Sequence, residues 1–204
     1  MVIQERTVTT EIADFITHAK FDDLPQAAVH EAKRVLLDSI GCAIAGLTTD
    51  KGKLSVQLAR RLGGPPESTV IGVGGKISST NAAFANGELI NALDWDAGVV
   101  PPGHSTPCVV AASLALAESI GASGKELVLA MALGHEISGR LGSVLTDLQE
   151  PAAEGPVPIL PPVHGYSMHS LGAAAAAGKI LNLTVRRWHR PSALPDIWPL
   201  FQQW

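Results

Sequence analysis

Apolar side chains recur every three to four residues through most of this sequence, a spacing typical of helices that bury one face. Ile12, Phe15 and Ile16 follow possible N-caps at Thr9 and Thr10, which predicts a first amphipathic helix. The same pattern, interrupted by glycine and proline, predicts further helices over residues 25–46, 51–62, 79–93, 107–119, 124–141 and 171–183. We therefore expect a mainly all-α protein with a helical-bundle-like domain.

The helix predicted over residues 25–46 begins with Pro25 at its first position, behind Asp22 and Asp23, and ends near Gly46. At about 1.5 Å per residue it would be roughly 30 Å long, enough to cross a whole domain. Because an apolar stripe follows its whole length, we expect this helix to be a central, buried element.

One stretch has β character. Thr69, Ile71 and Val73 suit a short strand, and the neighbouring glycines suit a turn, so we predict a single short β-hairpin. Between Asp147 and His164 we predict an extended loop, because prolines there rule out regular structure (Pro151, Pro156, Pro158, Pro161 and Pro162).

The character of the chain changes after Leu183, where basic residues, prolines and tryptophans replace the alanine-rich pattern. The sequence thus predicts a helical domain over residues 1–183 and an atypical, irregular C-terminal tail over residues 184–204.

The composition excludes several classes of protein. With 46% hydrophobic and 17% charged residues, a chain of 204 residues can bury a core, so disorder is excluded as its main state. A net charge of −4 offers no basic surface for nucleic acid or for an anionic membrane. The longest uncharged apolar run, about ten residues, is too short to span a bilayer. Cys42 and Cys108 are expected to be buried free thiols, so we predict a cytoplasmic protein.

Two sequences resemble cofactor or metal motifs but have the wrong spacing. A phosphate-binding loop would need a glycine at Val70, five residues before the Gly75 and Lys76 pair. A zinc-protease helix beginning at His135 would need a second histidine at Gly139. We therefore expect no cofactor and no metal, and we expect His135 to be a packed or hydrogen-bonded helix residue.

One segment brings catalytic side-chain types together. Asp94 and Asp96 end one predicted helix, and His104, Ser105 and Thr106 directly precede the next. Free N–H groups at a helix start suit a substrate carboxylate, and a nearby histidine can act as a general acid or base. A purely structural interpretation is also open, with solvated aspartates and Ser105 or Thr106 as an ordinary N-cap.

The chain resembles the MmgE/PrpD family in four successive blocks: LLDSIGCAIAGL, NGELINALDWD, HSTPCVVAASLALAE and SGKELVLAMALGHEISGRLG. This family includes 2-methylcitrate dehydratases, cis-aconitate decarboxylases and an iminodisuccinate epimerase. The similarity covers about residues 10–183 and concerns only the N-terminal part of such proteins.

The resemblance implies a part of the family's large helical domain, a homodimer, a small polycarboxylate substrate and neither metal nor organic cofactor. In decarboxylase members, the aspartate that matches Asp94 and the histidine that matches His104 line the active site. A further family histidine matches His164, or His169 if the alignment shifts. The resemblance thus implies Asp94, His104 and His164 as catalytic residues.

Two departures from the family pattern bear on the reaction. A threonine that lines the decarboxylase site falls at Gly98, which favours a 2-methylcitrate dehydratase-like lyase acting by proton abstraction. The family's active-site lysines fall beyond this chain, and Lys76, Arg140 and Lys179 are candidate carboxylate binders by their charge alone. The alternatives are a truncated, non-catalytic helical paralogue that associates with other chains, or an epimerase or decarboxylase of the same family.

Overall fold

The computed structural model describes residues 7–98, 103–147 and 166–188. Regular structure in these ranges is mainly helical, with one small hairpin, which confirms the predicted fold class. The elements are α1 (Val8–His18), the 3₁₀ helix η1 (Phe21–Asp23), α2 (Gln26–Gly46), α3 (Asp50–Leu62), β1 (Ser68–Thr69), β2 (Lys76–Ile77), α4 (Ser79–Asn91), α5 (Thr106–Ile120), α6 (Gly124–Asp147), α7 (Tyr166–Ile180) and α8 (Val185–Trp188).

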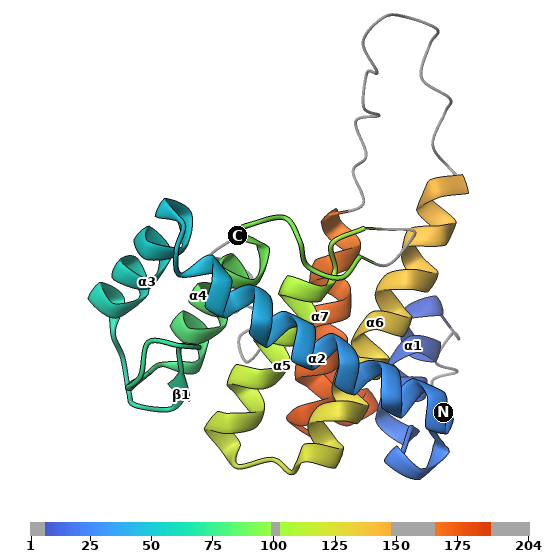
Figure 1. Cartoon of the computed structure of the whole chain (residues 1–204). Helices are drawn as coiled ribbons and strands as arrows, with labels where there is room; N and C mark the ends of the chain where they lie inside the picture. Colours follow the sequence, from blue (N-terminus) through green and yellow to red (C-terminus); the bar gives the residue numbers. More distant parts are fainter. Residues whose placement is uncertain (1–6, 99–102, 148–165, 189–204) are drawn as a thin grey trace, which may run out of the picture.

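Helix α5 forms the centre of the fold. It packs against α4, α6 and α7, and most of its side chains from Thr106 to Ala117 are buried (Figure 1). A helix that is apolar all round is stable only when other elements cover all its sides, and the run of valine, alanine and leucine in α5 meets that description. Not one helix in the described ranges has the length and hydropathy needed to cross a bilayer.

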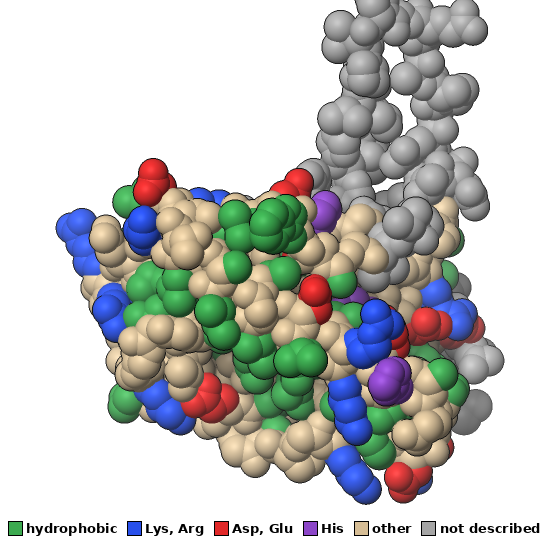
Figure 2. Space-filling model, in the orientation of Figure 1, with side chains coloured by type: hydrophobic (Ala, Val, Ile, Leu, Met, Phe, Trp, Pro, Cys, Tyr) green, Lys and Arg blue, Asp and Glu red, His purple; other side chains and the backbone are tan. Residues whose placement is uncertain are grey.

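The prediction that the long second helix is central is wrong. Helix α2 lies diagonally across the outside of the other helices (Figure 1), and apolar side chains gather on the face that it crosses (Figure 2). Its Leu37 and Ile44 side chains are exposed, while Val29 and Ala43 are buried. One face of α2 therefore packs on the other helices, and its opposite face is exposed to solvent.

Two helix starts differ from the predictions by a few residues. Thr7, not Thr9 or Thr10, caps α1, because its Oγ1 accepts a hydrogen bond from the backbone N–H of Thr10 at 3.2 Å. Pro25 occupies the N-cap position of α2 rather than its first helical position. Both shifts lie within the uncertainty with which any local signal marks a helix boundary.

The predicted hairpin is present but its strands are shorter than expected. Thr69 of β1 pairs with Lys76 of β2 in antiparallel register, and the intervening glycines supply backbone conformations with positive φ. The side chain of Asn86 holds the turn, donating to the carbonyl of Thr69 at 3.0 Å and accepting from the N–H of Ile71 at 2.9 Å. The glycine-rich segment is a hairpin turn, as its spacing predicted.

Helices α6 and α7 pack closely because small residues line their contact. A Cβ atom at Gly172 would lie 2.5 Å from the carbonyl oxygen of Gly134, a distance that real Cβ contacts do not reach. The buried hydroxyl of Ser138 donates across the same contact to the carbonyl of Met168 at 3.2 Å. The small-residue run after Leu171 therefore serves close helix packing, as the sequence predicted.

The chain after Leu183 begins with a short helix. Helix α8 brings Trp188 against the apolar cluster formed by α1, α6 and α7, and the indole covers Gly178. Residues 189–204 lie outside the described residues, and the irregular tail stays a prediction.

Candidate active site

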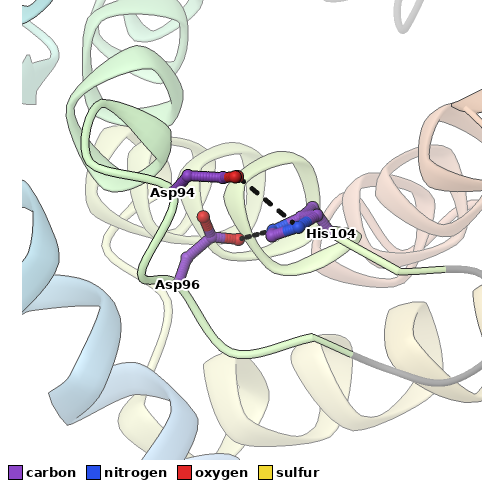
Figure 3. A group of neighbouring side chains, drawn as sticks. All are labelled: Asp94, Asp96 and His104. Atoms are coloured by element: carbon purple, nitrogen blue, oxygen red, sulfur yellow. Dashed lines mark hydrogen bonds and ion pairs between the residues drawn. The ribbon is translucent and has the colours of Figure 1, made fainter.

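The connection between α4 and α5 brings the side chains of Asp94, Asp96 and His104 together (Figure 3). Helix α4 ends at Asn91, and Asp94 then adopts a left-handed backbone conformation with φ of 56°. Aspartate reaches this conformation more readily than most residues, because its short polar side chain can hydrogen-bond locally. The resulting turn leaves both carboxylates facing the imidazole.

The two carboxylates contact different nitrogens of the His104 ring. Nδ1–H donates to Oδ2 of Asp96 at 3.0 Å, and Nε2 lies 3.5 Å from Oδ1 of Asp94. The Asp96 side chain has 0% exposed surface, whereas the Asp94 side chain is 76% exposed. Asp96 is therefore the buried partner of the ring, and Asp94 is the partner in contact with solvent.

A chain of hydrogen bonds continues behind Asp96. Asn91 Nδ2 donates to Asp96 Oδ1 at 3.2 Å, and Lys51 Nζ donates to Asn91 Oδ1 at 2.8 Å. The same ammonium group pairs with Glu88 at 3.1 Å. A buried carboxylate needs hydrogen-bond donors in place of water, and His104 and Asn91 supply one to each of its oxygens. Lys51 fixes the orientation of the Asn91 amide and, through it, that of the carboxylate.

The hydrogen bond to Asp96 raises the pKa of His104 above its ordinary value. Burial of the ring acts in the opposite direction, and the negative charges of Asp96 and Asp94 add to the rise. These interactions therefore favour the charged imidazolium more than in a free histidine. Since Asp96 holds Nδ1, Nε2 is the nitrogen that can exchange a proton with a ligand.

The structure brings Asp94 and His104 within reach of one another, as we expected from their positions around a helix-to-helix turn. The closer partner of His104, however, is Asp96, which the sequence analysis placed in the segment but did not select as a catalytic residue. Only the spacing of the two aspartates was available as a signal. Which of them is buried depends on packing against Asn91, and no local pattern reveals that. The catalytic roles of Asp94 and His104 stay predictions.

The hydroxyl groups at the start of α5 do not cap the helix. Ser105 occupies the N-cap position, but its side chain makes no capping hydrogen bond. Thr106 Oγ1 donates to the carbonyl oxygen of Ala97 at 2.5 Å, which ties the two ends of the connection together. Ser105 is thus the N-cap residue, as the structural interpretation expected, but its hydroxyl group does not cap the helix.

Asp94, Asp96 and His104 are also residue types that bind metal ions, and one potential ligand atom from each lies within 4.8 Å of the others. The carboxylates, however, approach the two ring nitrogens from different sides, and a single ion can bond to only one nitrogen of a ring. An ion at Nδ1 would displace the hydrogen bond to Asp96, and an ion at Nε2 would leave Asp96 as a hydrogen-bond partner of the ring rather than a ligand. The geometry suits an acid–base group better than a metal centre.

A cavity of about 510 Å³ lies beside this cluster, between α2, α6 and the α4–α5 connection. Its walls include Gly98, Thr106, His135 and Arg140. His135 is a hydrogen-bonded helix residue, as predicted, since its Nδ1 lies 2.8 Å from the carbonyl oxygen of Met131. Burial lowers the pKa of His135, whereas the hydrogen bond to Asp96 raises the pKa of His104.

The other residues considered for the site lie apart from it or outside the described ranges. His164 lies outside the described residues, and His169 is buried in α7. Lys76 pairs with a glutamate of α5 at 2.9 Å, and Lys179 donates to two backbone carbonyls near the end of α1. These two lysines therefore serve the fold. Arg140 borders the cavity and pairs with Glu136 on its own helix.

Comparison with known proteins identifies the relatives of this chain. The family model described as the MmgE/PrpD N-terminal domain matches residues 10–190. A cis-aconitate decarboxylase of Homo sapiens is 31% identical over 184 residues, which cover 88% of this chain and 37% of that protein. The Mus musculus cis-aconitate decarboxylase is 30% identical over 194 residues, or 93% of this chain and 38% of that protein.

A cis-aconitate decarboxylase of Aspergillus terreus is 31% identical over 144 residues, which are 68% of this chain and 29% of that protein. This chain thus spans less than two fifths of the length of these relatives. The family model that matches describes the N-terminal domain of these proteins.

Proposed function

We propose that this chain, which belongs to the MmgE/PrpD family, carries part of the acid–base site of a lyase that acts on a small polycarboxylate. The observation that carries the proposal is the contact of His104 Nδ1 with Asp96 at 3.0 Å, together with the contact of its Nε2 with Asp94 at 3.5 Å. A buried carboxylate that fixes one ring nitrogen and leaves the other for proton transfer is a common arrangement for a catalytic histidine.

In this proposal His104 is the general acid. Its raised pKa favours the ring that carries a proton on Nε2, and Asp96 stabilises this imidazolium. In a dehydration, a base removes the proton α to a carboxylate, the C–O bond breaks, and the imidazolium protonates the departing hydroxyl group to give water and a C=C bond. The exposed carboxylate of Asp94 stands beside Nε2 and is our candidate for the base.

The finer proposal is a dehydratase of the 2-methylcitrate type. It is supported by Gly98 at the position where the resemblance places a threonine in decarboxylases. A second candidate is a cis-aconitate decarboxylase, favoured by the names of the relatives. There the C–C bond to a carboxylate breaks, carbon dioxide leaves, and the acid protonates the carbanion. Both reactions need a proton donor at the position of His104.

The experiment that tests the proposal is turnover of 2-methylcitrate and of cis-aconitate by this chain, with His104→Ala and the exposed control His30→Ala. We expect His104→Ala to lower the rate by at least about a hundredfold and His30→Ala to leave it unchanged. Near-normal turnover by His104→Ala would contradict the assignment. Binding of polycarboxylates without any turnover would instead support the non-catalytic paralogue.

We also propose a homodimer, which the resemblance alone supports. Size-exclusion chromatography with light scattering measures the mass directly. A mass of one chain at micromolar concentration would contradict it. A cytoplasmic location stays a prediction.

A further inference from the structure

The cavity beside the His104 cluster is lined by His135, whose Nε2 atom has no hydrogen-bond donor among its neighbours. Its volume is about 510 Å³, and small apolar residues such as Ala28, Ala32 and Ala132 form much of its wall. His135 stands in this wall, and it has no role in the proposed lyase reaction. Its hydrogen bonds decide which of its nitrogens carries the proton.

Nδ1 of His135 lies 2.8 Å from the carbonyl oxygen of Met131. A carbonyl oxygen only accepts hydrogen bonds, so Nδ1 must carry the proton. Burial lowers the pKa of His135 and keeps the ring neutral near pH 7. A neutral ring has one proton, and Nε2 therefore presents a bare lone pair.

The neighbour of Nε2 cannot satisfy it. Thr106 Oγ1 lies 3.4 Å away, but its single proton is directed to the carbonyl oxygen of Ala97 at 2.5 Å. The shorter contact determines the direction of the hydroxyl proton. The threonine thus turns lone pairs toward the imidazole, and two acceptors face each other at the edge of the cavity.

We propose that this cavity is a ligand subsite in which Nε2 of His135 accepts a hydrogen bond from a hydroxyl group of the bound molecule. The choice of a hydroxylated polycarboxylate as that molecule rests on the proposed function. At neutral pH the carboxylates of such a molecule are ionised and only accept, so its hydroxyl is the sole donor that can complete His135. The subsite therefore selects hydroxylated over unhydroxylated polycarboxylates.

The charges at the cavity are mixed, which fits a subsite for one group of a ligand. Glu31 and Glu136 contribute negative charge, and Arg140 contributes positive charge that its ion pair with Glu136 partly neutralises. Such a rim gives a whole polyanion little net attraction. A hydroxyl on a short carbon chain needs only the apolar wall and the one imidazole acceptor.

Citrate and tricarballylate test the subsite, because they differ only in the hydroxyl group. By isothermal titration calorimetry we expect citrate to bind the full chain about tenfold more tightly. His135→Phe, which keeps a ring but removes the acceptor, should bring this ratio close to one. His135→Gln, which restores an oxygen acceptor, should recover part of it, and His30→Phe on the exposed side of α2 should leave it unchanged.

Nuclear magnetic resonance of the histidine ring nitrogens gives a second measurement on the unmodified chain. Citrate should shift Nε2 of His135, and tricarballylate should not. Equal binding of the two compounds, or an unchanged ratio in His135→Phe, would overturn the subsite and leave the proposed lyase standing. A preference for citrate in a chain that turns over neither 2-methylcitrate nor cis-aconitate would overturn only the lyase, and absence of binding by both probes would overturn only the subsite.

Discussion

Nδ1–H of His104 donates a 3.0 Å hydrogen bond to Asp96, an aspartate whose side chain is wholly enclosed by protein (Figure 3). The pair joins a half-exposed imidazole to a carboxylate that solvent does not reach. Hydrogen bonds from Asn91 to Asp96 and from Lys51 to Asn91 continue this contact to the start of α3. Four side chains are thus linked in one hydrogen-bonded chain.

Replacement of Asp96 by asparagine should lower the pKa of His104. The hydrogen bond that His104 donates to Asp96 is the largest cause of the present rise, and a neutral amide lacks the negative charge that favours the imidazolium. A titration followed by nuclear magnetic resonance measures the change directly. Asp94→Asn is the matched control and should give a smaller fall, because Asp94 acts only by its charge. Equal falls in both variants would contradict the ranking of the two carboxylates.

Asn91→Leu should destabilise the fold by about 1–3 kcal/mol, because it leaves Oδ1 of the buried Asp96 without its donor. Lys51→Met should cost less, since Asn91 keeps its contact with Asp96. Lys53→Met is the control, because Lys53 pairs only loosely with Asp50 at 3.8 Å on an exposed surface. Urea unfolding gives all three free energies, and an Asn91→Leu protein as stable as the parent would rule out a supporting role for the amide.

Gly172→Ala should destabilise the protein by about 1–3 kcal/mol, because its methyl group would collide with backbone of α6. The matched change Gly41→Ala, in the exposed middle of α2, should instead stabilise it by about 0.5–1 kcal/mol, since a Cβ there meets no atom within 4 Å. Thermal and urea unfolding test the opposite signs. Two variants with the same sign would argue against close contact of α6 and α7.

His135 should make the free energy of unfolding fall as the pH is lowered. Burial places its pKa below the ordinary value of 6.5, so the unfolded chain binds the proton first as the pH falls. Its contribution is therefore complete above 6.5 and declines below it, down to the lowered pKa. The loss of unfolding free energy between about pH 7.5 and pH 5.5 should be smaller in His135→Phe than in the parent.

His104 acts in the opposite direction, but both proteins contain it. Its raised pKa gives stability that is complete below 6.5 and is lost as the pH rises through the raised value. The comparison of His135→Phe with the parent therefore isolates His135. A loss of stability in acid that is identical in the two proteins would show that this ring does not titrate abnormally.

The helices and the hairpin could be predicted because their signals are local. Periodic apolar residues and the glycine cluster act within a few positions of the chain. The position of α2 could not be predicted, because several helices carry apolar faces. Which of them takes the centre depends on how they pack together, and α5 does so because it is apolar on every side.

The candidate site could be predicted only in part for a similar reason. The spacing of Asp94 and His104 around a turn is a property of one segment, and it indicated the correct region. The burial of Asp96 and the approach of His135 to Thr106 depend on contacts between segments far apart in sequence. Hydrogen-bond partners of that kind become visible only when the helices are assembled.

The bond between Thr106 and Ala97 has a mechanical consequence for the site. Ala97 directly follows Asp96, and Thr106 lies two residues after His104. This hydrogen bond therefore joins the two ends of the loop that carries Asp96 and His104. Thr106 and Ala97 also line the cavity, so a molecule bound there would contact the same residues that hold the loop. The His104 cluster and the cavity beside it thus share one structural hydrogen bond, and a substitution at Thr106 would affect both sites.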